Sequence, residues 1–198
     1  MSRFGAAAIL VATTALSACH GDSVTRGAEA CGGYAPWQTS EFVLPYPVGT
    51  TYTVIQGNCS GFGHSGVYRY SYDFGMAIGT PVTASADGVV YGIRSGYLDG
   101  DPTPGHENFV KIEHADGRIS AYSHLTDVVV QTGAAVAAGQ LVGHSGNTGN
   151  TGGTPHLHFH VSSCSEPSDC GTLPATFRNT DPNPDGLEAG RAYMALPY

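Results

Sequence analysis

The stretch TPHLHFHV, residues 154–161, alternates imidazoles with large apolar side chains. Successive side chains of a β-strand point to opposite faces, so His156, His158 and His160 would share one face and the apolar residues the other. The apolar face predicts a strand packed on a hydrophobic core. Histidine is also the commonest metal ligand, so the other face is either a polar strand surface or part of a metal site.

Length and composition favour a single β-rich domain. The chain has 198 residues, enough to bury a sizeable core, and contains 28 Gly and 12 Pro with few helical stretches. We expect an all-β, mainly antiparallel fold. The expected strands are 67–74, 81–93, 108–114, 118–125, 135–146 and 156–161. The sequence ADGR, 115–118, predicts a hairpin, because Asp-Gly tolerates the positive φ of tight turns.

The N-terminal residues are typical of an export signal. Arg3 precedes a run of apolar and small residues, 4–16, that is too short to span a membrane. The sequence LSAC, ending at Cys19, resembles the lipobox of bacterial lipoproteins, in which the cysteine carries the lipid. An ordinary secretory signal with a chance cysteine is the alternative.

The lipobox reading sets the expected organisation of the chain. We expect a signal peptide over 1–18, lipidation of Cys19, a tether over 19–41 and the folded domain over 42–198. The protein would then be an exported lipoprotein of the cell envelope, in contact with a membrane through its lipid.

Without Cys19 the chain has four cysteines, an even number suited to disulfides in an exported protein. Of the three possible pairings we expect the local one, because it clips two loop regions: Cys31 with Cys59, and Cys164 with Cys170. A zinc site made of Cys and His is disfavoured, since no CxxC spacing occurs.

The formal charge of −8 is scattered along the chain. Nucleic acid is therefore not an expected partner, and the acidity is better read as solubility. Nothing in the sequence indicates an oligomeric state.

Two further polar residues can join the histidine face. Asp73 ends the alternating segment YRYSYDF on its non-aromatic face, and His64 lies nearby in the Gly-rich segment GFGHSG. One carboxylate and two imidazoles suffice for a catalytic zinc ion, whose fourth position is left for water.

Four segments carry a family resemblance. His64, YDFGMAIGTPVTASADGVV (72–90), NFVKIEHADGRISAYSHL (108–125) and VAAGQLVGHSGNTGNTGGTPHLHFHV (136–161) resemble, in this order, the lysostaphin-type (LytM-like) zinc endopeptidases, which cut peptide bonds in bacterial peptidoglycan. The resemblance implies the lysostaphin-type peptidase fold, one Zn²⁺ ion, and peptidoglycan cross-link or stem peptides as substrate.

The resemblance also implies roles for individual residues. The zinc ligands would be His64, Asp73 and His158, and the catalytic histidines beside the bound water would be His124 and His156. One departure is the spacing, because eight residues separate His64 from Asp73, where the shortest family pattern has three; the longer spacing is associated with a subgroup.

The remaining histidines match no ligand position. His160 is taken as a strand-face residue or an outer partner of the site. The others are expected on loops or hairpin surfaces: His20, His106, His114 and His144. The Gly-rich segment 143–154 is either a wall of the substrate groove or flexible filler, and it lacks the ending of a phosphate-binding loop.

Two other functions agree less well with these residues. A catalytically silent relative could bind the cell wall or activate another wall hydrolase, but it would be expected to have lost ligands, and all five site positions are filled here. A purely structural lipoprotein would need no aligned histidines. No HExxH sequence occurs, so a glutamate base of the thermolysin kind has no candidate.

Overall fold

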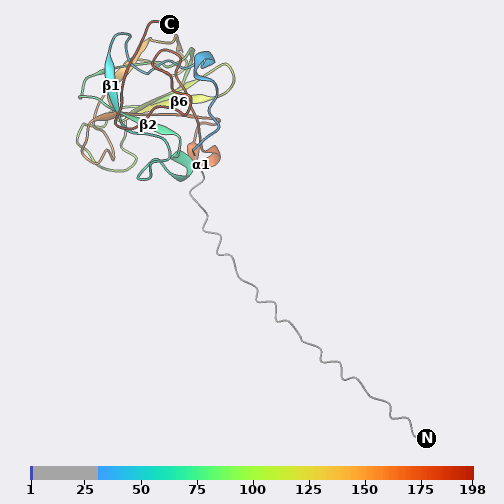
Figure 1. Cartoon of the computed structure of the whole chain (residues 1–198). Coiled ribbons are helices and arrows are strands. Elements are labelled where there is room, and N and C mark those ends of the chain that lie inside the picture. The colour runs from blue at the N-terminus through green and yellow to red at the C-terminus, as the bar shows by residue number, and fades with distance from the viewer. Residues whose placement is uncertain (2–30) are drawn as a thin grey trace.

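The computed structural model describes Met1 and residues 31–198 (Figure 1). Residues 2–18 of the expected signal peptide, the lipidation site Cys19, His20 and the tether up to residue 30 lie outside the described residues. The strands are β1 Thr51–Gln56, β2 Ser71–Gly75, β3 Pro81–Thr83, β4 Gly88–Arg94, β5 Phe109–Glu113, β6 Ile119–Ser123, β7 Leu125–Val128, β8 Ala135–Val136, β9 Leu141–Ser145, β10 His156–Ser162, β11 Thr172–Leu173 and β12 Ala192–Met194. The short helices are η1 Trp37–Thr39, η2 Gly66–Tyr68 and α1 Pro167–Cys170.

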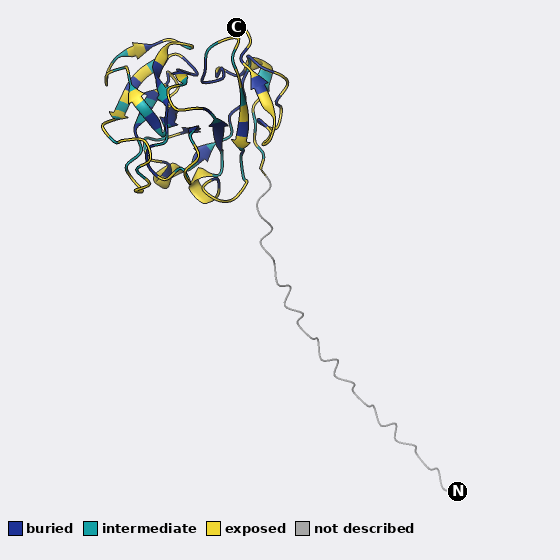
Figure 2. Ribbon diagram, turned by 90° about the vertical axis from the view of Figure 1, so that its left-hand side faces the viewer, coloured by how far each residue is buried: buried dark blue, intermediate teal, exposed yellow. Residues whose placement is uncertain are grey.

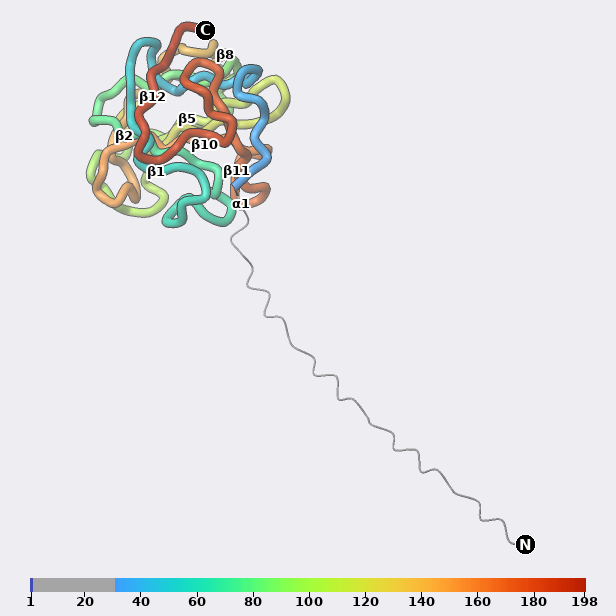
Figure 3. The backbone as a smooth tube through the Cα atoms, viewed as in Figure 1, coloured from blue at the N-terminus to red at the C-terminus, as the bar shows by residue number. Residues whose placement is uncertain are grey.

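The described strands form two antiparallel sheets. The larger has nine strands in the order β12-β1-β2-β10-β6-β5-β4-β8, with β11 added to β10, and the smaller has the order β3-β9-β7. Figure 3 shows the C-terminal segment, in red, running beside β1, although the two are far apart in sequence. The all-β, mainly antiparallel expectation is confirmed, and β10 lies inside the large sheet between β2 and β6.

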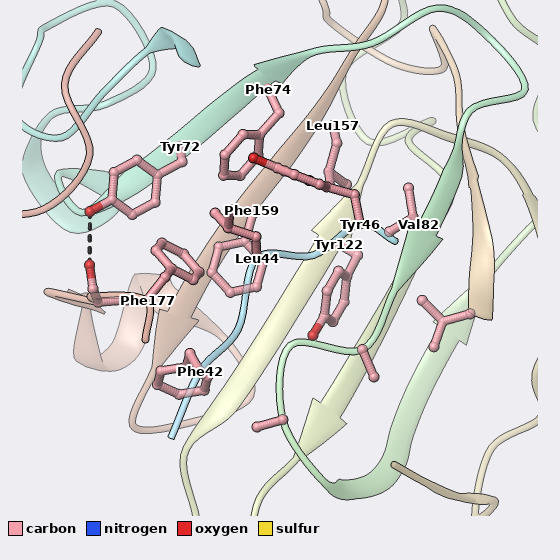
Figure 4. Close-up of a cluster of buried hydrophobic side chains, with 14 of the residues drawn as sticks. Phe42, Leu44, Tyr46, Tyr72, Phe74, Val82, Tyr122, Leu157, Phe159 and Phe177 are labelled. Atoms are coloured by element: carbon pink, nitrogen blue, oxygen red, sulfur yellow. Dashed lines mark hydrogen bonds between the residues drawn. The ribbon is translucent and has the colours of Figure 1, made fainter. Parts of the chain in front are cut away.

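The core lies on the apolar face of β10. Leu157 and Phe159 are fully buried there, with Phe74 of β2 and Tyr122 of β6 beside them (Figure 4). Each such side chain contributes roughly 1.5–3 kcal/mol on burial. In Figure 2 the buried ribbon lies mainly towards the middle of the molecule. A strand anchored by this face holds its histidine face in a fixed position.

Four expected strands are shorter or divided. The segment 67–74 starts with the turn η2, because the backbone groups of Arg69 and Tyr70 bond to Cys59 and to Thr172 instead of to a neighbouring strand. The segments 81–93 and 135–146 each split into two strands that belong to different sheets. The segment 118–125 is also divided: β6 ends at Ser123, His124 has a φ of 65°, and Leu125 begins β7 of the smaller sheet.

The hairpin expected at 115–118 is present. Strands β5 and β6 pair on either side of it, and Gly117 has a φ of 82°. His114, expected at the surface, is instead buried: its Nδ1 donates to the Asp87 carbonyl at 2.8 Å and its Nε2 lies 2.9 Å from Ser120 Oγ. The expectation was wrong because the ring finds a partner for each nitrogen beneath the hairpin.

Two more of the histidines that match no ligand position are described, and both lie at the surface. His106 contacts Asp101 at 2.7 Å, and His144 contacts Asp127 at 2.7 Å, with both imidazoles partly exposed. These two agree with the expectation from sequence.

Both expected disulfides are present. Cys31 is bonded to Cys59, which fastens the start of the described chain to the loop after β1. Cys164 is bonded to Cys170, which clips the loop that follows β10 and contains α1. Within residues 31–198, no helix has the length and apolarity needed to cross a membrane.

Candidate metal centre

Strand β10 brings its histidines to the residues expected to join them. His158 is paired in register with Asp73 of β2 on one side and with Ser123 of β6 on the other. Because β10 is sandwiched between these strands, the pairing follows from the sheet topology. The His158 Nδ1 atom lies 2.8 Å from Asp73 Oδ1.

His64 reaches this point from the loop between β1 and β2. Gly61, Gly63 and Gly66 all have positive φ, so the loop can turn tightly around it. The His64 Nδ1 atom donates to the Gly57 carbonyl at 2.9 Å, so Nε2 is the nitrogen left for a metal ion. That Nε2 is buried without a hydrogen-bond partner and lies 3.2 Å from Asp73 Oδ1. Burial by itself lowers the pKa of His64, but the adjacent Asp73 carboxylate outweighs it and raises that pKa.

Asp73 carries the negative charge of the centre. It is buried, which by itself raises its pKa, but the neighbouring imidazoles, His158 first and then His64, hold that pKa well below its ordinary range. A buried carboxylate needs positive charge close to it, which either a protonated imidazole or a bound cation supplies.

These three side chains fit a metal ion. One ligand atom from each of His64, Asp73 and His158 lies within 4.8 Å of the others. Two imidazole nitrogens and one carboxylate oxygen form a donor set that catalytic zinc uses, with a fourth position left for water. The unpartnered His64 Nε2 is the atom that such an ion would satisfy.

Two more histidines stand beside the three. His156 and His124 have ring centroids 4.8 Å apart. Each donates from Nδ1 to a backbone carbonyl at 2.7 Å, His156 to Thr154 and His124 to Thr148. In both neutral rings Nε2 is therefore the nitrogen that can accept a proton.

Burial keeps both rings neutral. It lowers the pKa of His124 to about 4, helped by the nearby imidazoles, and it also lowers the pKa of His156. His124 has a φ of 65°, a conformation that costs a residue other than glycine roughly 1–3 kcal/mol and is concentrated at functional sites.

All five residues line one cavity of about 500 Å³. Asn150 and Thr151 of the Gly-rich segment form part of its wall, which agrees with the groove reading of that segment. Arg94 pairs with Glu107 at 3.0 Å elsewhere on the wall. Further lining comes from Phe62, Tyr68, Phe109, Lys111 and Glu166.

Sequence reasoning missed most of this wall and the carbonyls that orient the rings. Phe62 carried one signal in the sequence, because an aromatic residue between two glycines is unusual for a simple turn. In the structure its side chain is 87% exposed. The carbonyls of Gly57, Thr148 and Thr154 carry no side-chain signal, so a motif search cannot find them.

The family model of peptidase family M23 matches residues 67–170. The chain belongs to peptidase family M23. The matched segment contains Asp73, His124, His156 and His158, and begins three residues after His64.

Two curated relatives align with part of this M23 family member. The peptidoglycan DD-endopeptidase ShyA of Vibrio cholerae is 44% identical over 89 residues, which are 45% of this chain and 19% of ShyA. The glycyl-glycine endopeptidase ALE-1 of Staphylococcus capitis is 34% identical over 116 residues, 58% of this chain and 30% of ALE-1. The matches thus span less than a third of either relative.

A solved structure supports the M23 fold. The deep-sea M23 metalloprotease pseudoalterin superposes with a TM-score of 0.53 at 20% sequence identity, covering 80% of this chain and 97% of pseudoalterin. At this identity the similarity concerns the fold alone.

Proposed function

We propose that this chain is a zinc metalloendopeptidase that hydrolyses peptide bonds in the cross-links or stem peptides of bacterial peptidoglycan. The observation that carries the proposal is the convergence of His64, Asp73 and His158 in a cavity that also holds His124 and His156. The names of the similar relatives, both endopeptidases and one of them a peptidoglycan enzyme, support the substrate class.

The ligand set proposed for one Zn²⁺ ion is His64 through Nε2, Asp73 through its carboxylate and His158 through Nδ1. When bound in such a site, zinc polarises a peptide carbonyl and lowers the pKa of a bound water to about 7. Asp73 is already ionised and the Gly57 carbonyl already orients His64, so little rearrangement is needed.

His124 and His156 are proposed to move protons. Their lowered pKa values keep both rings neutral near pH 7, so an Nε2 can accept the proton of the attacking water. The ring protonated in this way then donates that hydrogen to the leaving amine, and the unprotonated Nε2 of the other ring can accept a hydrogen bond from the attacking water and so orient it. The bonds to Thr148 and Thr154 hold the rings in the required orientation.

The walls of the cavity suit an extended peptide. Asn150 and Thr151 offer amide and hydroxyl groups on one segment, while Phe109 packs against Arg94 and Lys111, whose cationic groups lie 4.8 and 5.1 Å from its ring. Such a groove can hydrogen-bond a peptide backbone and also contact its side chains.

We also propose the organisation inferred from sequence. Residues 1–18 would be a lipoprotein signal, Cys19 would carry the lipid, residues 19–41 would form a tether and residues 42–198 the peptidase domain. The last part of this tether is fastened to the domain by the disulfide at Cys31. The domain would then act in the cell envelope, where peptidoglycan lies.

Digestion of purified sacculi tests the function. The zinc-loaded protein should release muropeptides whose masses identify a cleaved peptide bond, and a chelator should stop the release. The fragments also distinguish D-alanyl cross-links from glycine bridges. Intact sacculi from both wall types, treated with protein shown to contain zinc, would refute the proposal.

A further inference from the structure

The third imidazole of β10, His160, has no part in the mechanism above. Its side chain is buried and shares the face of His158. In the sheet it is flanked by Ser71 of β2 and Ala121 of β6, small residues that leave room for a ring. The ring of Tyr68 packs edge-on against it, with centroids 5.6 Å apart. His160 is therefore held in one place by packing.

His160 contacts His158 through a specific pair of atoms. The His160 Nδ1 atom lies 3.2 Å from His158 Nε2, whereas His158 Nδ1 faces Asp73. A neutral imidazole carries its hydrogen on one nitrogen only. If Nδ1 of His158 is a metal ligand, its hydrogen must be on Nε2, and His160 Nδ1 is the acceptor within reach.

The other nitrogen of His160 also needs an explanation. Its Nε2 is buried and has no hydrogen-bond partner among the described residues. An unpaired buried polar atom is unfavourable, so a purely structural position would be better filled by an apolar side chain of similar size. The presence of a histidine at this position is explained if its other nitrogen, Nδ1, makes a hydrogen bond that the site requires.

We propose that His160 is a positioning residue of the metal centre, which accepts a hydrogen bond from His158 Nε2 and so holds His158 Nδ1 towards Asp73 and His64. The inference rests on the proposed function, because it takes His158 as a metal ligand. Partners of this kind orient a ligating histidine and fix its tautomer.

The same contacts define how the hydrogens rearrange when metal binds. In the metal-free protein, with both rings neutral and Asp73 ionised, His158 Nδ1 would donate to Asp73 and His160 Nδ1 would donate to His158 Nε2. Metal binding releases the hydrogen of His158 Nδ1 to solvent. The hydrogen of His160 Nδ1 passes to His158 Nε2, and one hydrogen is taken up at His160 Nε2. Both rings change tautomer with no net change in their hydrogens.

Two matched variants test the hydrogen bond. In His160→Asn the side-chain oxygen can take the place of Nδ1 as acceptor, whereas His160→Leu has similar branching but no acceptor. The dissociation constant for Zn²⁺, measured by competition with a chromogenic chelator, should rise about 10–100-fold in the leucine variant and stay closer to wild type in the asparagine variant. Thermal unfolding of the metal-free proteins checks that both variants fold.

Nitrogen NMR of the wild-type chain needs no variant. In the zinc-loaded protein the hydrogens of both His158 and His160 should be on Nε2. A hydrogen on His160 Nδ1, an equal zinc affinity in all three proteins, or an equal loss in the two variants would overturn the inference. Failure of the proposed function would look different, because wild type would then bind zinc no better than His158→Ala.

Discussion

Alanine replacement of two histidines on one face of β10 should separate metal binding from proton transfer. His158 belongs to the three-residue cluster and contacts Asp73 Oδ1 at 2.8 Å. The His156 Nε2 atom lies 3.7 Å from the same oxygen and outside the cluster, with its ring held by the Thr154 carbonyl. We expect His158→Ala to lose zinc and His156→Ala to retain it.

The sizes of the two effects follow from these positions. His158→Ala removes one of three protein ligands, so zinc should be lost to a mild chelator and activity with it. His156→Ala leaves the three ligand atoms in place and removes a proton-transfer group, which contributes roughly 10²–10⁴-fold. That loss corresponds to about 2.7–5.4 kcal/mol of activation free energy.

Two quantities are measured for each purified variant: the number of zinc ions per chain, by mass spectrometry, and the rate of sacculus digestion. His144→Ala is the control, because His144 is a partly exposed surface residue paired with Asp127 and should change neither quantity. If His156→Ala loses zinc as completely as His158→Ala, the assignment of roles is wrong. If both variants digest sacculi like wild type, the cavity is not the active site.

Three further predictions concern export, the disulfides and acid stability. A fatty-acid analogue should label the wild-type protein in cells but not Cys19→Ser; equal labelling would contradict the lipid anchor. The exported protein should contain no free thiol, since each disulfide contributes roughly 2–4 kcal/mol; alkylation at Cys164 or Cys170 without reduction would count against it. The pKa of His124 is lowered to about 4, so its contribution to stability is complete above pH 6.5. It decreases by about 3 kcal/mol as the pH falls towards 4, because only the unfolded chain takes up the proton. The free energy of unfolding in urea, measured without metal, should therefore change more steeply with pH in this range for wild type than for His124→Gln. Equal slopes would refute the lowered pKa of His124.

The sequence by itself determined the strand at 156–161 and the different character of its two faces. Alternation is a local property of a strand, so Leu157 and Phe159 could be assigned to the core before any neighbour was known. The Asp-Gly hairpin and the Cys164–Cys170 disulfide were predictable for the same reason, since each depends on residues close together in the chain. The Cys31–Cys59 disulfide, with a sequence separation of 28, followed from the even number of cysteines and the choice of the local pairing.

The family pattern extended this reading to residues far apart in sequence. It added His124 to Asp73, which alternation had already indicated, and the structure brings both to the cavity. His64 shows the limit of spacing arguments, because the eight residues before Asp73 include a turn, η2, that alternation alone had assigned to a strand.

Only the tertiary structure decided which groups complete the centre. The register of β10 against β2 and β6 sets His158 opposite Asp73 and leaves room for His160 between Ser71 and Ala121. The tertiary structure also buries His114, which the sequence had placed at the surface. The carbonyls that orient the rings and the cavity walls come from loops far apart in the chain. Such contacts depend on how the strands are ordered in the sheet, and the strand order is a property of the whole fold.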